Sequence, residues 1–168
     1  VLDSSASTCI DIRSSNVTFD GNGYTIDGID GSNTYGIYVY NWPHILSDIS
    51  IKNVTVSDWI WGIRFSYAEK TSILNPNSTS NNHGISFSTV SESDLTNNKV
   101  LNNANFGMQL SNISFSTISN TIAQGDNGGI SLDGGSRNNT FINNIASANA
   151  VGIGLTSAYN NTFINNIA

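Results

Sequence analysis

Apolar residues recur along the chain in short alternating runs, each opened by glycine. Glycine followed by Ile or Met, and then by another apolar residue two positions later, occurs at six places. The pairs begin at Gly36, Gly62, Gly84, Gly107, Gly129 and Gly152, with spacings of 26, 22, 23, 22 and 23 residues. Alternation with period two predicts a strand with one buried face, and its regular return predicts one such strand per coil.

Two further sets of apolar residues follow the later glycines. Leu95, Ile118, Phe141 and Phe163 form a second inward set, and Val100, Ile122, Ile145 and Ile167 form a third. Two or three short strands per repeat, with Asn, Ser and Gly at the corners, indicate a chain that winds around a narrow apolar interior. We therefore predict an all-β fold, a single-stranded right-handed parallel β-helix (solenoid) of about seven coils. The predicted β-helix comprises residues 1–168, which form a single domain or part of a longer solenoid.

The composition supports strands over helices and adds a structural role for asparagine. The chain has 26 Asn, 25 Ser, 14 Thr and 15 Gly, which are poor residues for a helix interior. Asparagine also recurs at nearly equivalent positions in successive coils. Coils stacked about 4.8 Å apart would align these amides into a hydrogen-bonded ladder. The predicted ladder residues are Asn98, Asn120, Asn144 and Asn166.

The charge balance excludes two classes of partner. The net charge is -6 with only six Lys plus Arg, so the clustered cations that neutralise nucleic-acid phosphates are missing. The sequence has no apolar run of about 18 residues, so we expect no membrane span. The single cysteine, Cys9, excludes an internal disulfide.

Two segments resemble a known family. NVTFDGNGYTIDG, from Asn16 to Gly28, looks like an opening coil of the pectin-lyase-like superfamily, in particular of NosD-type periplasmic or surface proteins. NNTFINNIAS, from Asn138 to Ser147, and its partial copy at the C-terminus are similar to the repeat unit of that branch. The resemblance implies a parallel β-helix located outside the cell or at its surface. It does not imply one activity, because the superfamily includes lyases, hydrolases, epimerases, adhesins and envelope proteins.

Catalytic chemistry in such enzymes requires acidic or basic residues on adjacent coils. The outward residue of each first strand can be read from the repeat, and the column runs Asp11, Tyr38, Arg64, Ser86, Gln109, Ser131, Gly154. No two carboxylates lie side by side in it, so we assign no catalytic residue and regard an enzymatic role as the less favoured reading.

Metal and cofactor sites find little support in the sequence. Asp20, Asp27 and Asp30 are the densest acidic group and are weak candidates for Ca²⁺, because Asp-Gly and Asn-Gly turn chemistry is the favoured explanation of these residues. His44 and His83 lie at least a coil apart without Cys or Met companions, so the copper role in the NosD name does not transfer. We expect no cofactor.

Aromatic residues gather in one part of the chain. Tyr38 and Tyr40 alternate with inward residues and must point outward, and three tryptophans follow in the same coil or at its edge. The predicted partner-binding or carbohydrate-binding residues are Tyr38, Tyr40, Trp42, Trp59, Trp61 and Arg64. A protein interface, a platform for sugars and the packing of a longer loop all explain this group.

Two functions follow from these observations. The sequence starts and stops within a coil and has no recognisable cap, and uncapped strand edges pair with similar edges. We therefore expect an extracellular structural protein of the cell envelope, a surface-layer, sheath or filament subunit that self-associates through ends and edges. The alternative is a carbohydrate-binding module, or a fragment of a polysaccharide-active enzyme, whose ligand lies on the aromatic group.

Overall fold

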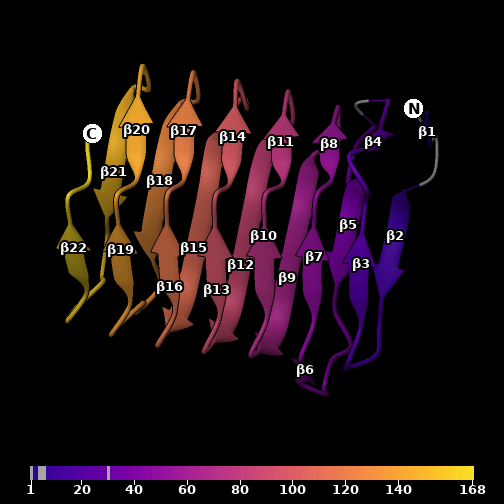
Figure 1. Cartoon of the computed structure of the whole chain (residues 1–168), viewed down its shortest axis with the longest axis horizontal. Coiled ribbons are helices and arrows are strands. Elements are labelled where there is room, and N and C mark those ends of the chain that lie inside the picture. Colours follow the sequence, from indigo (N-terminus) through magenta and orange to yellow (C-terminus); the bar gives the residue numbers. More distant parts are fainter. Residues whose placement is uncertain (1, 4–6, 30) are drawn as a thin grey trace.

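The computed structural model describes residues 2–3, 7–29 and 31–168. These residues form 22 strands and no helix, and every strand pair is parallel. Figure 1 shows the coils side by side, from β1 at the N-terminal end to β22 at the C-terminal end. The predicted right-handed parallel β-helix is confirmed. No helix of the described residues is long and apolar enough to cross a bilayer.

Three sheets run along the stack. Sheet A contains β1 (Leu2–Asp3), β4 (Thr25–Asp27), β8 (Thr55–Ser57), β11 (Asn77–Thr79), β14 (Lys99–Leu101), β17 (Ile122–Gln124) and β20 (Ile145–Ser147). Sheet B contains β2 (Thr8–Ile12), β5 (Tyr35–Val39), β9 (Trp61–Glu69), β12 (His83–Ser91), β15 (Phe106–Ser114), β18 (Gly128–Asp133) and β21 (Val151–Leu155), and β6 (Leu46–Ser47) pairs with β9. Sheet C contains β3 (Thr18–Asp20), β7 (Ser50–Lys52), β10 (Ser72–Leu74), β13 (Asp94–Thr96), β16 (Thr117–Ser119), β19 (Thr140–Ile142) and β22 (Thr162–Ile164).

The repeated glycine stands where a side chain would collide with the neighbouring coil. The apolar residues that follow it pair in register in sheet B, for example Ile63 with Ile85 and Ile85 with Met108, and these side chains are fully buried. A Cβ atom on Gly84 would lie only 2.5 Å from the carbonyl oxygen of Gly107. Glycine is therefore required by the distance between the coils, since any side chain would push them apart.

Of the four residues predicted for the third inward set, only one points into the core. Val100 is buried, and its register partners in the next two coils are Ala123 and Ala146, which are also buried. Ile122 pairs instead with the exposed Lys99, and Ile145 pairs with Ile122, so both isoleucines point outward. The register is shifted by one residue from the prediction, and a shift of one residue moves every side chain to the opposite face.

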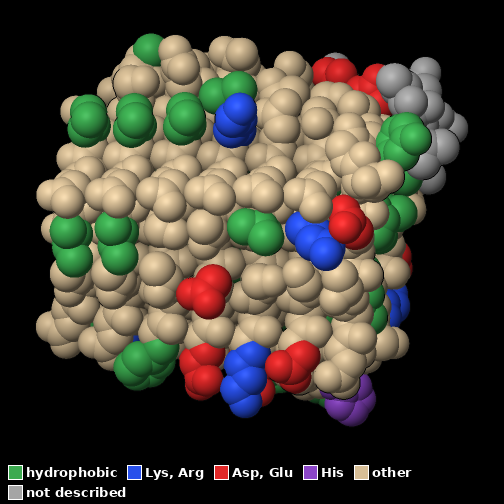
Figure 2. Space-filling view, in the orientation of Figure 1, with side chains coloured by type: hydrophobic (Ala, Val, Ile, Leu, Met, Phe, Trp, Pro, Cys, Tyr) green, Lys and Arg blue, Asp and Glu red, His purple; other side chains and the backbone are tan. Residues whose placement is uncertain are grey.

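This shift places aliphatic side chains on the surface. Ile122, Ile145 and Ile167 are successive neighbours on the outside of sheet A, and Ile142 and Ile164 are neighbours on the outside of sheet C. Figure 2 shows both rows of hydrophobic side chains on one face of the molecule, with a basic side chain at the end of one row. We call these residues the aliphatic rows.

The predicted asparagine ladder exists, with one correction. Asn98, Asn144 and Asn166 lie in one inward column, but Thr121 occupies the place between Asn98 and Asn144. Asn120 is exposed and has a φ of 52°. It therefore forms the corner, where asparagine tolerates the left-handed conformation, and the residue after it turns inward.

Two more ladders of hydrogen-bonded side chains lie at other corners of the coil. In the first, Asn81, Asn103, Asp126 and Asn149 succeed one another, and each side-chain oxygen accepts the backbone N–H of the preceding member. In the second, Ser93, Ser116, Asn139 and Asn161 do the same. Buried amides and hydroxyls thus satisfy backbone groups that have no partner within a strand.

Candidate binding surface

The outer face of sheet B carries the column that the repeat predicted. Pairing in register runs from Asp11 through Tyr38, Arg64, Ser86, Gln109 and Ser131 to Gly154. Asp11 and Arg64 are its charged members, and Asp11 pairs with Arg13 at 2.7 Å. Among the described residues of this column, no second carboxylate accompanies Asp11.

A row of aromatic rings runs beside this column. Tyr35, Trp61, His83 and Phe106 pair in register on four successive strands, β5, β9, β12 and β15. The rings of Trp61 and His83 are stacked at 4.0 Å between centroids, and those of His83 and Phe106 at 5.7 Å. Each of these residues directly precedes a repeat glycine, so the signal was present in the sequence although only Trp61 was predicted for the surface. We call this set the aromatic row.

The predicted tyrosines extend the row along β5. Tyr38 stacks on Tyr35 at 4.4 Å, and Tyr40 stacks on Tyr38 at 5.4 Å. Trp42, which is 59% exposed, contacts Tyr67 at 4.5 Å at the corner beyond the strand. Tyr38, Tyr40, Trp42 and Trp61 therefore belong to one continuous aromatic surface.

Trp59 requires a correction, because it is only 1% exposed. It lies at the inward corner before β9, and its indole Nε1 donates to the backbone oxygen of Ile26 at 3.4 Å. A Cβ atom on Gly28 would meet the Trp59 ring at 2.8 Å, so glycine makes room for the indole. Trp59 fills the core and offers no surface to a partner.

Arg64 lies where the column and the aromatic row meet. Its guanidinium carbon is 4.2 Å from the centroid of Trp61 and 6.0 Å from that of Tyr35. No ion pair with an acidic side chain is formed by Arg64 within the described part of the chain, and its Nε is buried without a hydrogen-bond partner. The surface therefore contains an uncompensated cation held between rings.

His83 acts in the row as a neutral ring. Burial and, to a smaller extent, the positive charge of Arg64 lower the pKa of His83 to about 4. Its Nδ1 is buried and has no hydrogen-bond partner. At neutral pH the imidazole is uncharged, so Arg64 supplies the positive charge of this surface.

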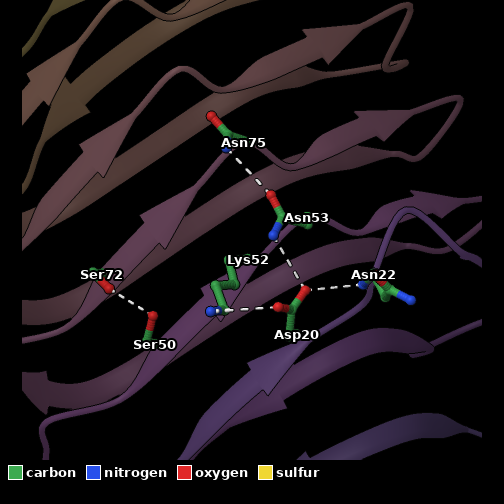
Figure 3. Close-up of polar contacts among 7 residues, drawn as sticks. All are labelled: Asp20, Asn22, Ser50, Lys52, Asn53, Ser72 and Asn75. Atoms are coloured by element: carbon green, nitrogen blue, oxygen red, sulfur yellow. Dashed lines mark hydrogen bonds and ion pairs between the residues drawn. The ribbon is translucent and has the colours of Figure 1, made fainter.

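The two calcium candidates that the structure describes, Asp20 and Asp27, lie in different sheets. Asp20 accepts hydrogen bonds from the backbone N–H of Asn22 and from Nδ2 of Asn53, and lies 3.3 Å from Nζ of Lys52 (Figure 3). The hydrogen bond from Asn22, more than the neighbouring Lys52, lowers the pKa of Asp20. Asp27 lies in a different sheet and accepts a hydrogen bond from Ser57 at 2.6 Å. Asp30 falls outside the described residues.

Comparison with known families identifies the chain. The family described as "Periplasmic copper-binding protein (NosD)" matches residues 3–167. The chain belongs to the NosD family. This is a periplasmic family, so the predicted location outside the cytoplasm is confirmed. No curated protein sequence matches this NosD-family chain.

Solved structures confirm the fold of this NosD-family chain. The Dettilon tailspike protein has a TM-score of 0.74 at 16% identity, over 90% of this chain and 33% of its own. A variant of the periplasmic alginate epimerase AlgG has a TM-score of 0.70 at 15% identity, over 93% of this chain and 47% of its own. The A-module of the mannuronan C-5 epimerase AlgE4 from Azotobacter vinelandii has a TM-score of 0.60 at 16% identity, over 95% of this chain and 57% of its own. The chain thus spans between a third and somewhat more than half of these proteins' length, and identities this low establish the fold alone.

The copper in the family description does not fit the residues of this chain. His44 is exposed on a corner, His83 is stacked between two rings, and Met108 is fully buried. Within the part of the chain that the structure describes, no three His, Cys, Asp or Glu side chains gather in a group that could hold a metal ion. The soft and nitrogen ligands that copper prefers are therefore dispersed over the described part of the coil stack.

Proposed function

We propose that this protein binds a polysaccharide on the outer face of sheet B. The observation that carries the proposal is the guanidinium of Arg64, which has no acidic partner among the described residues and lies between the rings of Trp61 and Tyr35. A cation surrounded by aromatic rings matches a sugar that has both an apolar ring face and an acidic group.

The arrangement of the surface suits a chain-like ligand. The aromatic row runs across four strands, so it follows the axis of the stack. Parallel strands repeat about every 4.8 Å, which is close to the length of one sugar residue in an extended chain. One protein of similar fold is named as a periplasmic alginate epimerase and another as a mannuronan C-5 epimerase, and alginate is an acidic polysaccharide.

The same geometry favours binding over catalysis. The outward column of sheet B has no adjacent carboxylates among its described members, and the lowered pKa of His83 makes it a weak base at neutral pH. Acid–base cleavage or epimerisation needs a proton donor and acceptor of matched pKa at the ligand. We therefore infer that this face binds its ligand and does not catalyse a reaction on it.

The test is calorimetric titration with alginate oligosaccharides and with neutral cello-oligosaccharides of equal length. Wild type is expected to bind the acidic series more tightly. Trp61→Ala is expected to weaken binding of both series about tenfold, because it removes the ring on which Arg64 and the sugar rest. Arg64→Gln is expected to remove the preference for the acidic series and the salt dependence.

Lys99→Gln is the matched control, since Lys99 is an exposed cation on the outer face of sheet A. It changes the net charge as Arg64→Gln does and is expected to bind like wild type. Equal losses in the two variants would mean that general electrostatic attraction, and not this site, binds the ligand. Wild-type affinity in Trp61→Ala would contradict the proposal.

Self-association is a second candidate, and the aliphatic rows favour it. Adjacent exposed isoleucines on sheets A and C form a surface that excludes water when two copies pack together. Ile145→Asp is expected to keep the protein monomeric in sedimentation velocity at concentrations where wild type associates. Leu74→Asp, which alters an isolated outward residue of β10, is the control and is expected to associate like wild type. A purely monomeric wild type would contradict this candidate.

A further inference from the structure

The aromatic row ends in a hollow on the outer face of sheet B. It is lined by the apolar side chains of Phe106 and Val151, by Gly128 and Gly154, and by the hydroxyl-bearing Ser131 and Thr156. Its volume is about 320 Å³. We call it the Phe106 slot.

Beside Phe106 in the row stands a glycine, and the Phe106 ring lies over its backbone. Gly128 pairs with Phe106 in register and therefore occupies the place of a fifth side chain. One neighbour of Phe106 in the row is His83, at 5.7 Å, while on the other side stands only a backbone. A Cβ atom on Gly128 would lie 2.6 Å from Cδ1 of Phe106, so even alanine would force the ring to move.

The outward column of sheet B, which runs from Asp11 to Gly154, also has small side chains at this place. Gln109 is followed by Ser131 and then by Gly154, so the outward side chains shrink along the stack. The lining residues contribute a ring, small apolar surfaces, hydroxyl groups and the amide of Asn127, and none of them is charged. A sugar ring has a C–H face that packs on an aromatic ring and hydroxyl groups at its edge that exchange hydrogen bonds with Ser and Thr.

We infer that the Phe106 slot is a subsite that receives one uncharged part of a polysaccharide, a sugar ring packed against Phe106. This inference rests on the proposed function and adds where the bound chain continues. Arg64 lies on β9 and the slot is centred on β18, which is three coils further along sheet B. Three strand spacings amount to about 14 Å, so one ligand reaches both places only if it has several sugar residues.

The inference is tested by titrating alginate oligosaccharides of two to eight residues. Affinity of the wild type is expected to rise about tenfold at the length that first reaches the slot. Ser131→Leu places a larger side chain in the slot from an outward position and is expected to abolish this gain while disaccharide binding stays unchanged. Phe106→Ala removes the ring and is expected to abolish the same gain.

Ser119→Leu is the matched control, because Ser119 is an outward residue of β16 whose neighbour on β19 is Ile142. It makes the same exchange on sheet C and is expected to leave every affinity unchanged. Circular dichroism and thermal unfolding establish that each variant is folded. Wild-type affinity for long oligosaccharides in folded Ser131→Leu, or a wild type without length dependence, overturns the slot while the Arg64 site stands. Absence of binding at every length overturns both proposals.

Discussion

Replacing Asn144 by alanine is expected to lower the free energy of unfolding by about 3 kcal/mol or more. The side chain is fully buried, and its Oδ1 accepts the N–H of Thr121 at 2.9 Å. Its Nδ2 donates to the carbonyl of Ile118 at 2.9 Å and to Oδ1 of Asn166 at 2.8 Å. Alanine leaves these groups without partners inside a closed corner, where water does not replace them. Urea unfolding followed by circular dichroism measures the loss.

Asn120→Gly is the control for this prediction. Asn120 resembles the ladder residues in sequence but is exposed with a positive φ, which glycine adopts without strain. Its free energy of unfolding is expected to stay within about 0.5 kcal/mol of the wild type. If Asn120→Gly destabilised the protein as much as Asn144→Ala, the assignment of Thr121 to the ladder would be wrong.

Replacing Asp126 by asparagine is expected to stabilise the protein at neutral pH. Asp126 is 4% exposed in a ladder whose other members are asparagines, and burial raises its pKa from 3.8 to about 6 despite two hydrogen bonds from Asn103. Its Oδ2 has no partner. Since the folded pKa lies above the unfolded one, stability falls as the pH rises from about 4 to about 6 and then stays low. The expected gain above pH 7 is about 3 kcal/mol.

Urea unfolding of wild type and Asp126→Asn at pH 7.5 and at pH 4 tests this expectation. The difference between the two proteins is expected to shrink at pH 4, where the wild-type carboxyl is protonated in the folded state. Asp94→Asn alters an exposed aspartate on β13 and controls for the change in net charge. A difference that is the same at both pH values would refute the role of a buried charge.

The fold and one column of the surface were predictable because the repeat shows them directly. A glycine followed by alternating apolar residues returns at nearly constant spacing, so the inward Ile85 and the outward Arg64 follow from counting. Counting was less successful at the corners, where Asn120 and Asn144 stand in similar sequences but lie outside and inside. The residue after a corner residue with positive φ turns inward, and the sequence pattern does not show that Asn120 is a corner residue while Asn144 follows one.

The sequence by itself determined the coil, its period and the order of residues along the outer column, because strand alternation and stacking act over one repeat. Only the tertiary structure decided that Trp59 fills the core, that Ile145 faces outward and that four rings before the glycines form a row. These features depend on the register between coils. Register is fixed by contacts between residues more than twenty positions apart, which a local pattern does not contain.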